Sequence, residues 1–124
     1  MKKFLIATLF SLAATSVMAD GAMKPMYNGI MSEAISGSRA ELIADGNMIM
    51  IYLTSHHGED IATQGSSGEL TLLTGKDKQV LTLLPSGGNA FMVQGQFKLI
   101  SGTKALAKVT LPGKAVDQFR FEFK

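Results

Sequence analysis

The chain has 124 residues, no cysteine, and 12 basic against 10 acidic side chains. This length is typical of one domain. The lack of cysteine excludes disulfides, thiolate catalysis, cysteine-ligated zinc and iron–sulfur clusters. The sequence has only two histidines and none of the common hydrolytic, metalloprotease or nucleotide-binding motifs, so we expect a protein that is not an enzyme.

The start of the chain has the pattern of a cleavable signal peptide. Two lysines precede an apolar run over residues 4–14, and Val17 and Ala19 supply the small or apolar side chains that signal peptidase inspects. The run is shorter than the about 20 apolar residues needed to span a bilayer. We therefore predict a signal peptide at residues 1–19 and a periplasmic mature protein with no membrane insertion after cleavage.

Cleavage of this segment would change the charge of the protein. Lys2 and Lys3 would leave with it and no acidic residue would, so basic and acidic side chains would be equal in number. The mature chain then lacks the basic surface on which nucleic-acid binding depends. We expect neither nucleic acid nor an anionic membrane surface as a partner.

Short apolar stretches and turn residues organise the rest of the chain. Residues 20–28 are polar and contain glycine and proline, which predicts a flexible lead that also carries methionine. Beyond it, apolar stretches recur every eight to twelve residues or so, as in β-sandwiches and barrels. We predict an all-β domain over residues 29–124, namely a single antiparallel β-sandwich of about seven strands.

The first predicted hairpin surrounds Asp45-Gly46, a dipeptide suited to the positive φ angles of a tight turn. Its outgoing strand, residues 47–54, is apolar on both faces, which predicts a central strand covered on both sides. Met48 and Met50 of this strand are then expected in the core, because methionine fills irregular core gaps. Met92, in the strand expected over residues 90–97, has the same interpretation.

Two further hairpins are expected downstream. Strands over residues 69–74 and 79–84 are predicted around a short polar connection. The last two strands, residues 104–111 and 117–123, alternate most regularly. The final strand carries phenylalanine at every second position, opposite polar and charged residues, so we expect it to pack one face on a core.

The mature part of the chain is rich in methionine near its start. Met23, Met26 and Met31 fall within nine residues of one another. A thioether is a soft, uncharged ligand that favours Cu(I), and by the same softness Ag(I), over harder cations. The three methionines are therefore candidate ligands for copper or silver, although packing is an alternative role for them.

The only two histidines form a second candidate set. His56 and His57 are followed closely by Glu59 and Asp60. Imidazole and carboxylate groups suit Zn(II) or Cu(II). Neighbouring side chains in a strand point apart, so both histidines can join one site only if the turn at Gly58 folds them together. An exposed polar turn is the alternative interpretation.

Several segments resemble a small periplasmic domain family associated with heavy-metal efflux. The similarity spans about residues 29–123, and Leu83-Leu84-Pro85-Ser86-Gly87-Gly88-Asn89 is its most distinctive part. The other segments are Ala40-Glu41-Leu42-Ile43, Ile51-Tyr52-Leu53, His57-Gly58, residues 68–75, Val109-Thr110-Leu111-Pro112-Gly113-Lys114 and residues 119–121.

The resemblance implies a setting for the protein. Members of the family stand alone or are joined to the periplasmic adaptor of tripartite cation pumps. They commonly open with His-Gly-Gly. The corresponding segment of this chain is Met26-Tyr27-Asn28-Gly29, which offers a thioether ligand in place of the imidazole. We therefore expect a non-enzymatic accessory protein that binds copper, silver or a related cation and meets an efflux adaptor. The competing hypothesis is a metal-free module that docks an envelope protein.

Overall fold

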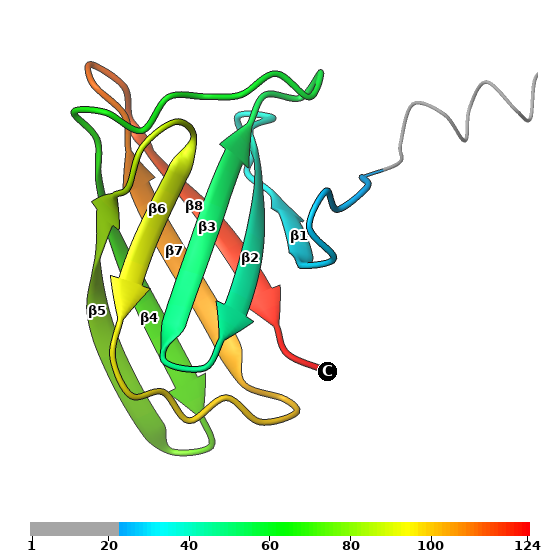
Figure 1. Ribbon diagram of the computed structural model, residues 1–124, viewed down its shortest axis with the longest axis vertical. Helices are drawn as coiled ribbons and strands as arrows, with labels where there is room; N and C mark the ends of the chain where they lie inside the picture. The colour runs from blue at the N-terminus through cyan, green and yellow to red at the C-terminus, as the bar shows by residue number, and fades with distance from the viewer. Residues whose placement is uncertain (1–22) are drawn as a thin grey trace, which may run out of the picture.

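The computed structural model describes residues 23–124 (Figure 1). The predicted signal peptide, residues 1–19, and the first residues of the lead lie outside this range. The described range contains no helix, and hence none long and apolar enough to cross a membrane. Its eight strands are β1 (Ile30–Glu33), β2 (Arg39–Asp45), β3 (Met48–Thr54), β4 (Ser67–Thr74), β5 (Asp77–Pro85), β6 (Ala90–Gln94), β7 (Lys104–Thr110) and β8 (Val116–Glu122).

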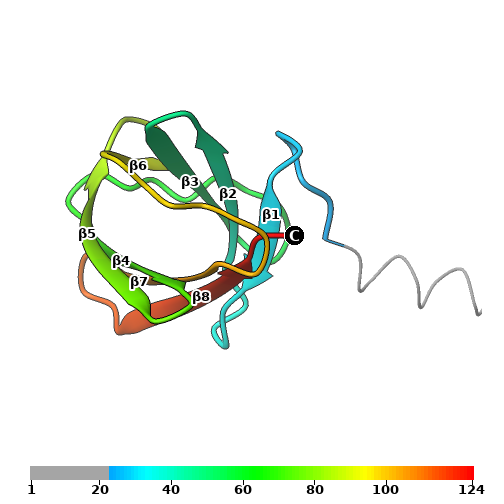
Figure 2. The same ribbon diagram turned by 90° about the horizontal axis from the view of Figure 1, so that it is seen from below.

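All eight strands belong to one sheet with the order β1-β2-β3-β6-β5-β4-β7-β8. Every neighbouring pair is antiparallel, which confirms the predicted all-β antiparallel class. The sheet curls until β8 lies beside β1, so its shape is nearly that of a barrel (Figure 2). Across this seam the backbone N–H of Arg120 donates a hydrogen bond to Oγ of Ser32, at 3.0 Å.

The structure has one strand more than the predicted seven, and a single curled sheet where two stacked ones were expected. The extra strand is β1, whose four residues are too few to display an alternating pattern. A sandwich would separate its two sheets. Here β5 pairs with β4 over most of its length and with β6 at Leu84 and Pro85, so the sheet is continuous.

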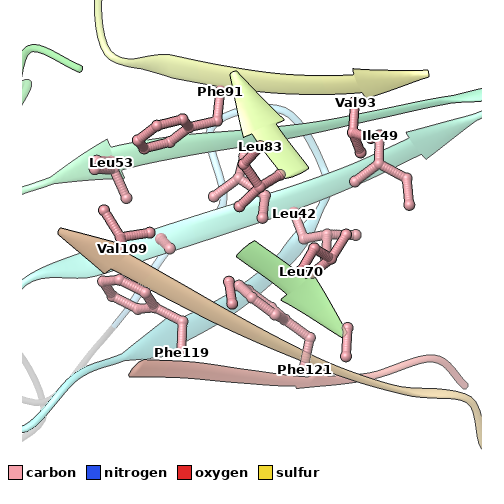
Figure 3. Packing of buried hydrophobic residues seen from close by; sticks show 14 of the residues in the cluster. Leu42, Ile49, Leu53, Leu70, Leu83, Phe91, Val93, Val109, Phe119 and Phe121 are labelled. Atoms are coloured by element: carbon pink, nitrogen blue, oxygen red, sulfur yellow. The ribbon is translucent and has the colours of Figure 1, made fainter. Parts of the chain in front are cut away.

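The core fills the interior of this curled sheet (Figure 3). Alternate residues of each strand point inward, and the aromatic rings of Phe91 and Phe119 are almost fully buried there. Phe121 is buried beside them, and Phe123, just past β8, is partly buried against the cluster. The prediction that the last strand packs one aromatic face on a core is thus confirmed.

The interpretation of β3 as a strand covered on both sides is wrong. Ile49 and Ile51 point into the core with no exposed surface, whereas Met48 and Met50 alternate with them and lie partly exposed on the outer face. Met92 of β6 is outward and partly exposed as well. The expectation that these methionines belong to the core fails because a curled single sheet has only one interior face.

Candidate functional site

A pocket of about 290 Å³ opens on the outer face of the sheet, between the lead and strands β1, β2 and β3. The lead passes beside β1 in Figure 1, and the turn that follows β3 closes the other side. Residues from four separate parts of the chain line the pocket. They include Met26, Tyr27, Met31, Arg39, Glu41, Tyr52, His56 and His57.

Strand register sets the floor of the pocket. Met31 of β1 pairs with Glu41 of β2, and Glu41 pairs with Tyr52 of β3, so these residues form one row. Their neighbours Leu42 and Ile51 are buried in the core. Because side chains alternate along a strand, the row itself points outward. The pocket is therefore built on the outer surface of the sheet and not in its interior.

Glu41 fastens the lead over this row. Its carboxylate accepts hydrogen bonds from the backbone N–H groups of Met26 at 2.8 Å, Tyr27 at 2.8 Å and Gly29 at 2.7 Å. Although it points out of the sheet, Glu41 is only 4% exposed. A buried carboxylate is stable only when hydrogen bonds or charges satisfy it, and three amide donors do so here. The sequence predicts a flexible lead, but these hydrogen bonds attach its main chain at Met26 and Tyr27 to the sheet.

The backbone of the lead turns sharply to present these donors. Asn28 has a φ of 60°, a conformation that asparagine tolerates better than most residues. Gly29 is needed at the next position, since a Cβ there would lie 2.5 Å from the carbonyl oxygen of Leu42. The Tyr27 ring lies 4.4 Å, centroid to centroid, from the Tyr52 ring, with 30° between the two planes. This contact adds an aromatic pair to the attachment of the lead.

The turn after β3 brings the two histidines together. Oγ of Ser55 accepts hydrogen bonds from the backbone N–H groups of His57 at 3.2 Å and Glu59 at 3.1 Å, while Gly58 has a φ of 90°. The ring centroids of His56 and His57 lie 5.4 Å apart, nearly perpendicular. Both side chains line the pocket, which meets the condition that the sequence set for a shared site.

His56 is also fixed from the side of β1. Its Nδ1 lies 2.8 Å from Oε2 of Glu33, and Nε of Arg39 lies 3.4 Å from the same oxygen. A carboxylate can only accept, so Nδ1 of His56 donates and carries the hydrogen. In the neutral ring this tautomer leaves the lone pair on the other nitrogen, Nε2. Carboxylates orient metal-binding histidines in this manner in many proteins.

The same contact lowers the pKa of the Glu33 carboxyl. The hydrogen bond from His56 is the largest cause. Desolvation, the second, raises the pKa, and the hydrogen bond and charge of Arg39 together with the charge of His56 lower it further. Because the folded-state pKa lies below the unfolded-state value, the contact stabilises the fold above the unfolded pKa. That contribution is lost as pH falls through the folded-state pKa.

Replacement of His56 by alanine is therefore expected to raise the pKa of Glu33 toward its ordinary value. The side-chain carboxyl resonance of Glu33, followed by NMR over an acid titration, measures this directly. His57→Ala is the matched control and should leave the Glu33 midpoint unchanged, because His57 makes no contact with that carboxylate among the described hydrogen bonds. An unchanged midpoint in His56→Ala would refute the assigned contact.

The pocket unites most, but not all, of the residues that the sequence predicted as ligands. Met26 and Met31 from the first set and His56 and His57 from the second line the same cavity. Met23 does not line it and lies on the exposed lead. Among residues 23–124 no group of three or more histidine or acidic side chains is arranged to hold a metal ion.

Two residues that hold the lead and His56 in place were not identified from the sequence. Glu41 stands between Ala40 and Leu42, which are both buried, and an acidic residue flanked by apolar ones was the available signal. Glu33 gave no signal, since its contact with His56 joins residues far apart in the chain. Comparisons of the chain with family models, with curated proteins and with solved structures found no match.

Proposed function

We propose that this chain is a non-enzymatic periplasmic accessory protein that binds a soft monovalent cation, Cu(I) or Ag(I). Its site is the pocket under the lead, with Met26, Met31 and His56 as ligands and His57 at the rim. The bound ion would be buffered there or handed to a component of a heavy-metal efflux or resistance system.

One observation carries this proposal. Met26, Met31, His56 and His57, which were singled out as ligands on chemical grounds alone, line one cavity although they come from three parts of the chain. Thioether sulfur and neutral imidazole are both suitable ligands for copper, and the thioethers select its monovalent state. A mixed set of this kind discriminates against hard cations such as Mg²⁺ and Ca²⁺, which require oxygen ligands.

The supports of the site fit a metal-binding role. The Glu33 carboxylate accepts the hydrogen on Nδ1 of His56, so that Nε2 of the neutral ring is the atom that would bind the ion. The three hydrogen bonds to Glu41 restrict the main chain that carries Met26. Ligands whose positions are fixed before the ion binds lose less conformational entropy on binding, which raises the affinity that a given number of ligands can provide.

The cellular setting rests on sequence features. The predicted signal peptide at residues 1–19 supports export to the periplasm, and thioethers, unlike thiols, do not form disulfides in an oxidising compartment. The resemblance to the efflux-associated family supports a role beside a periplasmic adaptor. The absence of cysteine from the sequence agrees with a site built on methionine.

A metal-free interaction module is the second candidate. Ile35, at the turn between β1 and β2, is fully exposed, and Val116, at the start of β8, is half-exposed. Both line a second pocket, of about 410 Å³, beside the seam between β1 and β8. Exposed apolar residues of this kind favour contact with another protein. In this second case the methionines under the lead would serve packing alone.

Titration with metal ions tests the first proposal. The purified protein, labelled with ¹³C at the methionine methyls, is titrated with Ag(I) and separately with Zn(II) in chloride-free buffer. We expect the Met26 and Met31 methyls and the His56 ring to shift with Ag(I), and the methionine methyls to stay in place with Zn(II). Cu(I) under anaerobic conditions should reproduce the Ag(I) result.

The double variant Met26→Leu/Met31→Leu should lower the affinity of the pocket for Ag(I) at least about tenfold, equivalent to about 1.4 kcal/mol, because both thioether ligands of the pocket are lost. Leucine keeps a similar volume, so the fold should persist. Met23→Leu, outside the pocket, is the matched control. Unmoved Met26, Met31 and His56 signals at an excess of Ag(I) would leave the interaction module as the better account.

A further inference from the structure

Three methionines that do not belong to the pocket share the outer face of the sheet. Met50 of β3 is the direct register partner of Met92 of β6, and these strands run side by side (Figure 1). Met48 precedes Met50 by two residues and therefore points to the same side. All three side chains are partly exposed, so an ion in solution can reach them.

The spacing of these side chains suits a shared ligand. Directly opposed residues of antiparallel strands have Cβ atoms about 4.5–5.5 Å apart. Met48 and Met50 lie about 7 Å apart along β3. Methionine has three rotatable side-chain bonds, which allows the sulfur atoms of Met50 and Met92 to converge on one point. Met48 can reach the same point from one side.

The surroundings of the pair favour a soft ion over a hard one. In the next strands on either side, the register partner of Met50 is Ile43 of β2 and that of Met92 is Leu84 of β5, so the four residues form one row across the sheet. No carboxylate, amide or hydroxyl side chain belongs to this row of four, whereas in the row beside it Met48 lies between Asp45 of β2 and Gln94 of β6. A cation that requires oxygen ligands finds none in the row, whereas Cu(I) or Ag(I) finds two thioethers. Strands prefer β-branched and aromatic residues, so packing alone would favour isoleucine or valine here.

We propose that Met50 and Met92, assisted by Met48, form a second site for a soft monovalent cation on the outer face of β3 and β6. The site is independent of the pocket under the lead and shares no ligand with it. Tyr52, the next outward residue of β3 after Met50, lines that pocket. The two sites therefore neighbour each other on one surface, and the protein holds up to two ions per chain.

Titration of the purified protein with silver nitrate, in chloride-free buffer, tests this second site. The ¹³C-methyl resonances of methionine are followed by NMR, and the number of Ag(I) ions per chain is counted by native mass spectrometry. We expect the Met50 and Met92 methyls to shift and two ions to bind. In Met50→Leu/Met92→Leu we expect one ion fewer per chain. Ile43→Leu, in the same row but without sulfur, should bind as many ions as the unmodified protein.

The Met26→Leu/Met31→Leu variant separates this site from the pocket. Shifts of the Met50 and Met92 methyls that persist in that variant support the second site, because the pocket has lost both of its thioethers there. Methyls of Met50 and Met92 that stay in place at an excess of Ag(I), in the unmodified protein and in this variant, overturn it even if the pocket binds. If Met50→Leu/Met92→Leu does not fold, the Met50 and Met92 methyl resonances of the unmodified protein still test the second site.

Discussion

Replacement of Glu41 by glutamine is expected to release the lead and to weaken Ag(I) binding in the pocket about tenfold or more. The carboxylate accepts three backbone N–H groups, whereas an amide offers one oxygen and turns an NH₂ group toward the remaining donors. A buried donor left unsatisfied costs about 1–3 kcal/mol, and the lead can avoid this cost by moving away. Met26 then leaves the pocket, and one soft ligand is lost.

Hydrogen exchange and metal titration together measure this effect. The amides of Tyr27 and Gly29 should exchange faster in Glu41→Gln, while amides of the β7–β8 hairpin keep their protection. Glu69→Gln is the matched control, because Glu69 is an exposed acidic residue of β4, away from the pocket. Unchanged protection at Tyr27 and Gly29, or unchanged Ag(I) affinity, would contradict the role given to Glu41.

Replacement of Phe119 by alanine is expected to lower the free energy of unfolding by about 3–5 kcal/mol. Phe119 is 1% exposed and lies on β8, the strand that meets β1 at the seam (Figure 3). Loss of its ring removes buried apolar area and leaves a cavity that the surrounding strands fill only in part. A loss of this size is a large fraction of the stability of a small domain.

Urea denaturation followed by circular dichroism measures the change. Gln118→Ala, on the outward face of the same strand, is the control and should change the unfolding free energy by no more than about 0.5 kcal/mol. A loss below about 1.5 kcal/mol in Phe119→Ala would mean that the ring is not a central part of the core.

Local features of the chain were sufficient to predict its hairpins. The Asp45-Gly46 pair marks the connection of β2 and β3, although the two-residue turn lies one position later, at Gly46 and Asn47. The period-two phenylalanines mark β8 correctly. Non-sequential pairings were not predictable in this way. The contacts of β3 with β6 and of β4 with β7 join segments far apart in the sequence and depend on how the whole sheet curls.

The candidate ligands were predictable from their side-chain chemistry, but the way in which the fold brings them together was not. Residue type and clustering along the chain nominated Met26, Met31, His56 and His57, because thioether and imidazole groups are suitable ligands for copper. Their convergence depends on the row that runs across β1, β2 and β3, and hence on β1, which the pattern did not reveal. Met50 was predicted to lie in the core, although its side chain points outward. The sequence pattern does not show which face of the strand is the interior, because that face is defined only when the whole sheet curls.

X-ray absorption at the copper edge tests the central claim, a soft-metal pocket under the lead, most directly. The Met50→Leu/Met92→Leu protein, which removes the second site, is loaded with one equivalent of Cu(I). We expect sulfur and nitrogen neighbours around the copper, and loss of the sulfur contribution when Met26 and Met31 are also replaced by leucine. A copper surrounded by nitrogen and oxygen alone, with no sulfur neighbour before that replacement, would contradict the account.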